Sequence, residues 1–376
     1  MTNPSSSSFD LAIVGAGIVG LAHALAATRL GKRVVVIDRD AQANGASIRN
    51  FGFITVTGQQ SGECWRRARR SRDIWDEIAP QAGIQIVHRG LDVVARRPSA
   101  ARVLQAFMET EMAEHCSFFS GSEAAARFPQ FTGKVAGILH SDEDLRVESR
   151  IAIPKLAAWL EQAKGVTFLR NTTVHAVEPP RIVTSSGTIE AEAAVVCGGD
   201  DFSGLFADRI AAYGLTRCKL HMMRARPDGG FRLDSAVMTD LSLVRYLGYA
   251  DLPEAAALKQ ELIDEQPAFL ANGIHLITVR SADGSLVLGD SHHYGPTPDP
   301  FAPESVDDLI IDEYEAVFGH RPRVTERWVG TYASAADRLM LMDKPRDDTR
   351  IVIVTSGTGA STSFAIAEET LADLYG

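Results

Sequence analysis

The fold is decided by residues 9–38, FDLAIVGAGIVGLAHALAATRLGKRVVVID. An apolar run leads into the glycines of residues 15–20, a stretch rich in alanine and leucine continues to Gly31, and a β-branched run then ends at Asp38. The two apolar runs predict buried strands, and the stretch between them predicts a helix closed by Gly31. The order strand, helix, strand predicts parallel strands and a doubly wound sheet.

Gly15, Gly17 and Gly20 form the pattern G-x-G-x-x-G where the predicted helix begins. Glycines at these places let the backbone turn tightly and approach a pyrophosphate, whose charge meets the helix N-terminus. Asp38 ends the next strand, where a carboxylate accepts both ribose hydroxyls, and Arg39 is placed to lie against adenine. This context predicts a dinucleotide site; the alternative is a glycine turn needed only for helix packing.

Two further predicted strands end in glycines, at Gly198 and Gly199 and at Gly357. A chain that uses only NAD ordinarily continues through consecutive strand–helix–strand units, whereas here a single unit runs into a loop with glycines between residues 45 and 58. Three glycine-rich strand ends at one edge of a sheet line a long cofactor, which favours FAD.

Composition limits the classes of function. The net charge of −10 excludes a nucleic-acid binder that relies on a basic surface. Four widely spaced cysteines without a C-x-x-C pair indicate neither a disulfide framework nor a metal cluster, so we expect a reducing, cytoplasmic setting. No targeting signal stands out, and His23, Thr28 and Arg29 interrupt the apolar stretch of residues 11–30, so no membrane span is expected.

The pattern along the chain predicts an α/β protein, α+β overall, with a Rossmann-like domain interrupted by an antiparallel one. Strand-like runs around Asp283-Gly284 predict a hairpin in the inserted part. The expected division is a flexible tail at 1–8, a FAD-binding domain with a parallel sheet at 9–84, 141–214 and 328–376, and a substrate-binding domain with an antiparallel sheet at 85–140 and 215–327.

Several stretches of sequence carry a resemblance to a known family. They are the opening at 13–40, GASIRNFGF at 45–53, LRVESRIAIPKLAAWLEQ at 145–162, TTVHAVE at 172–178, AAVVCGGDDFSGLF at 193–206 and VTSGTGASTSFAIAEETLADL at 354–374. In this order and spacing they resemble the FAD-dependent amine oxidoreductases that include D-amino-acid oxidase, glycine oxidase and sarcosine oxidase. The resemblance covers almost the whole chain.

The resemblance implies a FAD cofactor and the residues that contact it. Val174 is expected to meet the adenine through its backbone, and Gly357 to Ser361 are expected near the pyrimidine edge of the flavin. Ala46 stands where a histidine can anchor the ring and no cysteine follows Cys218, so the FAD is expected to be non-covalent. The cofactor-binding residues expected are Gly15, Gly17, Ile18, Gly20, Asp38, Arg39, Ser47, Asn50, Phe51, Gly52, Val174, Gly198, Gly199, Gly357, Thr358, Gly359, Ala360 and Ser361.

One departure from the family pattern bears on the substrate. Tyr332 occupies the place where amino-acid oxidases carry the arginine that pairs with the substrate carboxylate, and a second basic residue is replaced at or near Thr358. Residues 47–59, 288–295 and 355–362 resemble a bacterial branch associated with aminoalkylphosphonate breakdown. That implies 2-aminoethylphosphonate or its N-methyl derivative as substrate.

The implied reaction is oxidative deamination of a small, anionic primary or secondary amine. A hydride passes to the flavin, the imine is hydrolysed, and oxygen or another acceptor reoxidises the cofactor, with no obligatory catalytic acid or base. The alternatives are a glycine or sarcosine-type oxidase or dehydrogenase, a flavin-bearing binding protein, and an NAD-dependent dehydrogenase.

Candidate substrate residues supply hydroxyl, imidazole, amide and guanidinium donors, which suit the three oxygens of a phosphonate. They are Arg49, Asn50, Tyr246, His292, His293, Tyr294 and Tyr332. No metal site is expected, because no further metal-ligand spacing accompanies His292 and His293. His221 is interpreted as a sheet residue, and the arginines of residues 66–72 as a solvated, salt-bridged helix face.

Overall fold

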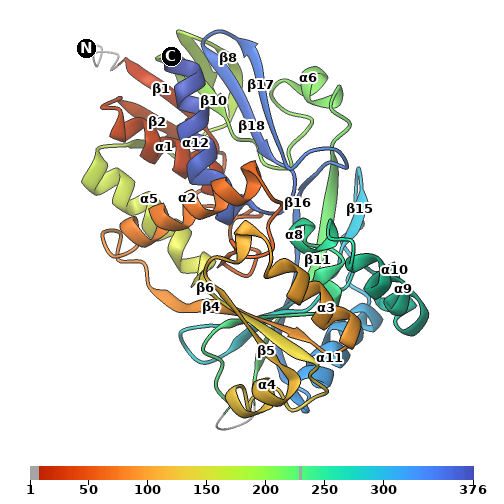
Figure 1. Cartoon of the computed structure of the whole chain (residues 1–376). Coiled ribbons are helices and arrows are strands. Elements are labelled where there is room, and N and C mark those ends of the chain that lie inside the picture. Colours follow the sequence, from red (N-terminus) through yellow and green to blue (C-terminus); the bar gives the residue numbers. More distant parts are fainter. Residues whose placement is uncertain (1–7, 228–230) are drawn as a thin grey trace, which may run out of the picture.

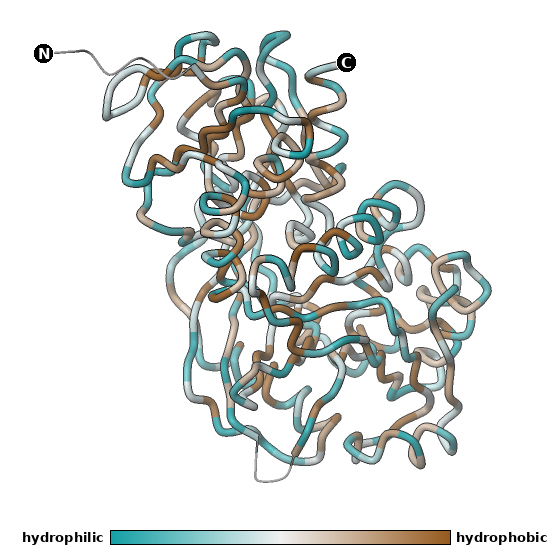
Figure 2. Tube along the Cα trace, turned by 90° about the vertical axis from the view of Figure 1, so that its left-hand side faces the viewer, coloured by the Kyte–Doolittle hydropathy of each residue, from teal (hydrophilic) through white to brown (hydrophobic). Residues whose placement is uncertain are grey.

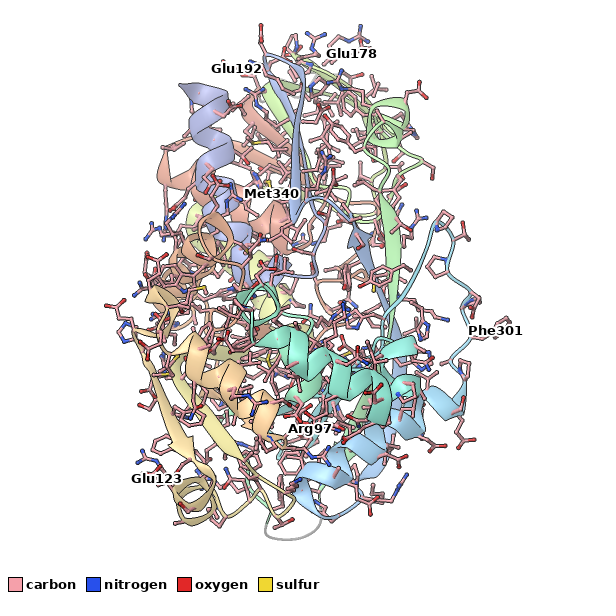
Figure 3. The ribbon with its side chains drawn as sticks, turned by 45° about the vertical axis from the view of Figure 1, so that its right-hand side comes forward. Arg97, Glu123, Glu178, Glu192, Phe301 and Met340 are labelled. Carbon is pink, nitrogen blue, oxygen red and sulfur yellow. The ribbon has the colours of Figure 1, made fainter. Side chains whose placement is uncertain are left out.

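The computed structural model describes residues 8–227 and 231–376, so residues 1–7 of the predicted tail lie outside the described part. Two sheets form the molecule, one near each end (Figure 1). Figure 3 shows Glu178 and Glu192 at the end that holds the first sheet and Glu123 at the opposite end. This pairing of a mainly parallel sheet with a mainly antiparallel one confirms the expected α/β class.

The first sheet has the order β17-β18-β10-β1-β2-β7, in which β18, β10, β1, β2 and β7 run parallel. Strands β8 and β9 continue from β10 as an antiparallel extension. Its strands are β1 (Phe9–Val14), β2 (Val34–Ile37), β7 (Thr167–Leu169), β8 (Val174–Glu178), β9 (Arg181–Thr184), β10 (Gly187–Val196), β17 (Met340–Arg346) and β18 (Thr349–Val354).

The two faces of this sheet are covered by different elements. Leu11 and Ile13 pack in one core with α1 (Ile18–Arg29), α5 (Ser149–Lys164) and α12 (Gly359–Tyr375), whereas Ala12 between them packs in a second core with β8, β9 and residues 202–215. Because successive strand residues point to opposite faces, these two cores lie on opposite sides. The first face carries helices as expected of a doubly wound sheet. On the second face β8, β9 and the short helix α6 (Ala207–Ala211) stand where such a sheet carries longer helices.

The second sheet has the order β15-β11-β14-β13-β12-β4-β6-β3, with β16 on β11 and β5 on β6. All its pairs are antiparallel except β12 with β4. Its strands are β3 (Phe53–Ile54), β4 (Ile86–Ala95), β5 (Cys116–Ser120), β6 (Gly137–Val147), β11 (Thr216–Arg226), β12 (Ala236–Thr239), β13 (Ile277–Arg280), β14 (Leu286–Gly289), β15 (His293–Gly295) and β16 (Arg323–Ser334). The predicted hairpin is confirmed as β13 and β14, whose turn contains Gly284 at φ +79°.

Further helices surround the second sheet. They are α3 (Pro98–Phe107), α4 (Gly121–Arg127), α7 (Asp240–Leu243), α8 (Leu247–Ala250), α9 (Ala255–Glu265), α10 (Pro267–Ala271) and α11 (Glu304–Phe318). Figure 2 shows hydrophobic stretches inside both halves and hydrophilic ones along the outer loops. The domain boundaries expected at 141 and 328 fall inside β6 and β16, and the division into domains stays a prediction. Within the described residues, no helix has both the length and the apolar character that crossing a membrane requires.

Helix α2 (Glu63–Ile78) joins the two halves and fixes the start of α12. Its arginines pair with carboxylates, such as Arg67 with Glu369 at 2.8 Å and Arg70 with Glu368 at 2.7 Å, so the predicted salt-bridged face is confirmed. Trp75 is 1% exposed, and its Nε1 donates a hydrogen bond of 2.8 Å to the carbonyl oxygen of Ala360. The indole thereby holds the first turn of α12 against α2.

We expect Trp75→Phe to lower the free energy of unfolding by about 1–3 kcal/mol, because it leaves the Ala360 carbonyl without its buried donor and creates a small void. Denaturant unfolding followed by circular dichroism measures this. Trp159→Phe, which changes a partly exposed tryptophan on α5, is the matched control. Equal losses in the two variants would contradict the role given to Trp75.

Candidate functional site

A cavity of about 850 Å³ lies where the ends of the first sheet meet the second sheet. Its walls include the glycine turns that follow β1, β10 and β18, the loop of residues 43–51, and side chains from β11, β13, β15 and β16. Its volume is within the range of about 300–1,000 Å³ typical of small-molecule sites. The cavity therefore gathers segments from across the whole chain into one site.

The turn after β1 is closed by backbone contacts that leave no space for side chains. Gly15 has φ +104°, and a Cβ added there would lie 2.4 Å from the carbonyl oxygen of Cys197. A Cβ on Gly20 would lie 1.9 Å from the carbonyl oxygen of Gly15. Gly17 precedes the first residue of α1 and lines the cavity. The helix N-terminus consequently opens onto the cavity, where its positive end favours an anion.

Asp38 and Arg39 lie at one end of the cavity, beside this turn. The Asp38 carboxylate accepts hydrogen bonds from the backbone N–H of Ala16 at 2.6 Å and of Asp40 at 2.8 Å. Two carboxylate oxygens have about four acceptor positions, so acceptor capacity remains for hydroxyl groups in the cavity. Arg39 donates to Asp201 at 2.9 Å, which places its guanidinium at the rim.

Hydrogen bonds tie the loop of residues 43–51 to the first residues of helices α1 and α5. Ser47 Oγ accepts a hydrogen bond of 2.9 Å from the N–H of Ile18, the first residue of α1. Asn50 braces the loop, since its Oδ1 accepts from the N–H of Gly52 at 2.6 Å and from Ser149 at 2.7 Å. Gly52 lies behind the loop, where a Cβ would be 1.9 Å from the carbonyl oxygen of Val147.

The turn before α12 forms the opposite wall. Gly357 has φ +74°, and a Cβ there would lie 3.1 Å from Cζ of Tyr332. Ser361 Oγ accepts a hydrogen bond of 2.8 Å from the N–H of Thr55, so the first turn of α12 is joined to the segment after β3. The N-terminus of this 17-residue helix thus opens onto the cavity as well.

Most of the residues predicted for the site line this cavity. Those that do are Gly15, Gly17, Ile18, Asp38, Arg39, Ser47, Arg49, Asn50, Phe51, Val174, Gly198, Gly199, Tyr246, His292, Tyr294, Tyr332, Gly357, Thr358, Gly359, Ala360 and Ser361. Three predicted residues do not: Gly20 and Gly52 lie behind the wall, and His293 packs its ring 5.8 Å from that of His221.

Sequence reasoning missed Arg245, which lines the cavity between α7 and α8. Its Nη2 donates a hydrogen bond of 2.8 Å to the hydroxyl of Tyr294. Burial disfavours its charge, but Tyr332, Tyr294 and Asp290 around it raise the pKa of Arg245, so the guanidinium stays protonated. Nothing in the local sequence marks this arginine, because the loop reaches the cavity only through the fold.

His275 and Asp290 were also missed. Both are buried and line the cavity beside His292. Backbone hydrogen bonds in both directions, of 3.2 and 3.0 Å, join His275 to Asp290 and extend the β13–β14 hairpin. Counting outward from the turn at Gly284 in the register of β13 and β14 places Ser291, not Asp290, opposite His275. A one-residue shift beyond the two strands brings His275 and Asp290 together, and the sequence carries no signal for that shift.

The wall fits a flavin dinucleotide. Two helix N-termini and the tight glycine turns suit phosphates, and Asp38 has acceptor capacity for a ribose. The cavity continues from there to Tyr332 and His292, and so exceeds what a mononucleotide needs. No histidine or cysteine stands at residue 46, which is alanine.

Comparisons with known proteins agree with this geometry. A sequence model of the family described as FAD dependent oxidoreductase matches residues 10–374. No protein of curated function matches the chain in sequence.

Similar solved structures share the fold over nearly the whole chain. Glycine oxidase from Geobacillus kaustophilus has a TM-score of 0.76 at 18% identity, covering 98% of this chain and 94% of that one. L-α-glycerophosphate oxidase from Mycoplasma pneumoniae, solved with FAD bound, has a TM-score of 0.76 at 14% identity, covering 98% and 95%. Iminodiacetate oxidase from Chelativorans sp. BNC1 has a TM-score of 0.70 at 16% identity, covering 96% and 94%. At such identities these structures show the fold alone.

We expect Gly17→Val to abolish binding of FAD, because the added side chain occupies the space that the pyrophosphate needs above the N-terminus of α1. The absorbance near 450 nm relative to that at 280 nm in the purified variant measures occupancy, and circular dichroism checks that the chain is folded. A folded, fully yellow Gly17→Val protein would rule out a pyrophosphate at this turn.

We expect the FAD to be held without a covalent bond. Acid precipitation of the yellow protein should then leave all of the flavin in the supernatant, which absorbance measures. Flavin that stays with the pellet would show a covalent link to another residue.

Proposed function

Because this chain belongs to the FAD dependent oxidoreductase family, we propose that it catalyses the oxidative deamination of a small amine that carries a phosphonate. The substrates proposed are 2-aminoethylphosphonate and its N-methyl derivative. FAD, when bound, supplies the acceptor for a hydride from the carbon that bears the nitrogen. The chain's own task is to hold the substrate in position and to bind its charged ends.

The observation that carries this proposal is the free charge of Arg245. Within residues 8–227 and 231–376, the guanidinium forms no ion pair with a carboxylate, and its hydrogen bond goes to the neutral hydroxyl of Tyr294. A partly buried cation without a paired anion is unfavourable, so a ligand that brings the anion is favoured at this place. An anionic substrate supplies the negative charge that Arg245 lacks.

The groups around Arg245 favour a phosphonate over a carboxylate. Tyr294 and Tyr332 line the same part of the cavity, and burial raises the pKa of Tyr332 well above its usual value, so its phenol stays protonated and able to donate. A phosphonate presents three oxygens in a tetrahedral arrangement, whereas a carboxylate presents two in a plane. One guanidinium and two hydroxyls therefore match the oxygens of a phosphonate in number.

A glycine or sarcosine-type reaction is the alternative, and glycine oxidase is among the proteins that share this fold. Anaerobic mixing with single substrates separates the two. We expect 2-aminoethylphosphonate or its N-methyl derivative to bleach the flavin absorbance, and glycine and sarcosine to leave it unchanged. Bleaching by glycine or sarcosine but by neither phosphonate would contradict the proposal.

We expect Arg245→Met to raise the KM for the phosphonate amine by about 10- to 100-fold, because charge-assisted hydrogen bonds to the anion are lost. Steady-state kinetics measures the change. Arg232→Met, which removes an exposed arginine paired with Asp234, is the matched control and should behave as wild type. An unchanged KM in Arg245→Met would show that another group binds the anion.

A further inference from the structure

We propose that His292, supported by Asp290 and His275, takes up the proton that the substrate ammonium must lose before its carbon can give up a hydride. The inference rests on the proposed function. It assigns residues to the ammonium end of the substrate, whereas Arg245 is assigned to the phosphonate end. An ammonium group has no lone pair with which to assist departure of a hydride, and alkylammonium groups have pKa values of about 10. Near pH 7 the substrate therefore arrives protonated, and a group in the cavity has to accept that proton.

The hydrogen bonds of His292 leave one ring nitrogen free for this task. Nδ1 lies 2.9 Å from the carbonyl oxygen of Gly273, which only accepts, so Nδ1 carries the proton of the neutral ring. Nε2 then has its lone pair available, 3.7 Å from Oδ2 of Asp290. Burial lowers the pKa of His292 well below its usual value, so the ring is neutral before substrate binds.

Asp290 is placed to stabilise the protonated ring. It is 4% exposed, and its Oδ1 lies 3.0 Å from Nε2 of His275, whose Nδ1 lies 3.3 Å from the hydroxyl of Ser242. Burial raises the pKa of Asp290, but positive charge on His292 and His275, when those rings are protonated, and on Arg245 lowers it, so the carboxylate stays charged beside an imidazolium. In the histidine–carboxylate pairs that accept protons in many enzymes, the carboxylate holds the other ring nitrogen. Here the carbonyl oxygen of Gly273 holds Nδ1, and Asp290 lies beside the accepting Nε2, where its charge stabilises the imidazolium.

The other groups that face His292 fit the same assignment. The ring of His275 stacks on it at 5.0 Å, and the rings of Tyr294 and Tyr332 lie 6.5 Å away. Those tyrosines stand beside Arg245, so the cavity has a cationic end for the phosphonate and a proton-accepting end for the amine. These two ends together suit a zwitterion, whose anionic group binds at the cationic end and whose ammonium group lies at the proton-accepting end.

The proton transfer balances without any further reactant. An N–H bond of the ammonium breaks, its electron pair stays on the nitrogen, and an N–H bond forms at Nε2 of His292. The resulting imidazolium lies beside the Asp290 carboxylate. When the product leaves and the cavity opens to water, the proton passes to solvent and the ring becomes neutral again.

A metal ion is the competing explanation, because one ligand atom from each of His275, Asp290 and His292 lies within 4.8 Å of the others. One observation favours the proton acceptor. The cluster holds no fourth histidine, cysteine or acid among the described residues, whereas structural metal sites ordinarily have four ligands.

The test is the pH dependence of flavin reduction by 2-aminoethylphosphonate, measured by anaerobic stopped flow with wild type, His292→Gln and Asp290→Asn. We expect His292→Gln to reduce flavin about 100-fold more slowly than wild type at pH 7 and to approach the wild-type rate at pH 10, where about half of the amine is already neutral. Asp290→Asn should change in the same direction. His140→Gln is the matched control, since that histidine lies 2.6 Å from Asp92 outside the cavity.

The outcomes separate the inference from the proposed function. If no phosphonate amine reduces the wild-type flavin, both are overturned. If wild type is reduced and His292→Gln is slower by the same factor at every pH, the histidine is only structural and the inference alone is overturned. Stoichiometric zinc in wild type, absent from His292→Gln, would also overturn it. If His292→Gln fails to retain FAD, Asp290→Asn decides by the same pH comparison.

Discussion

The close approach of two backbones at the ends of β1 and β10 is the constraint on which the rest of the structure depends. At Gly15 an added Cβ would lie 2.4 Å from the carbonyl oxygen of Cys197, so the two strand ends meet with no side chain between them. This contact leaves the N-terminus of α1 open toward the cavity. Hydrogen bonds from Ile18 to Ser47 and from Thr55 to Ser361 then tie the loop beside it and the start of α12 to the same place. Four segments far apart in sequence consequently form a single wall.

The two ends of the cavity offer different groups because one suits a cofactor and the other a substrate. Beside α1, backbone N–H groups and a helix terminus offer partial charges at fixed positions, which suit phosphates of a cofactor that stays bound. At the far end, the second sheet and its loops supply whole side chains: Arg245 with a permanent charge, and His292 with Asp290 beside it, for which we propose the uptake of the substrate's proton. A substrate that binds and leaves in every cycle needs such groups. The sheet that carries them is mainly antiparallel, so its hairpins place chosen residues opposite one another.

The parts of the fold that sequence predicts are those with local causes. The glycine pattern, the strand ending at Asp38 and the turn at Gly284 each depend on neighbours in sequence, and all were found where expected. The second face of the first sheet was not predicted in full. There β8, β9 and the short helix α6 pack on Ala12 and its neighbours, and these contacts join segments that are far apart in sequence. Arg245 was missed for a similar reason: its loop carries no motif, and only the tertiary fold brings it to the cavity. His292 and His293 are neighbours in sequence, but only His292 lines the cavity. Successive residues of a strand point to opposite faces, and His293, the first residue of β15, packs against His221 instead.

The most direct test of the two-ended cavity is a crystal structure of the FAD-loaded protein with 2-amino-2-methylpropylphosphonate. This analogue has no hydrogen on the carbon that bears the nitrogen, so it binds without being oxidised. The predicted result has the phosphonate oxygens within hydrogen-bond distance of the Arg245 guanidinium and the nitrogen directed toward Nε2 of His292. A phosphonate bound away from Arg245, or the reversed orientation with the nitrogen beside that guanidinium, would contradict it.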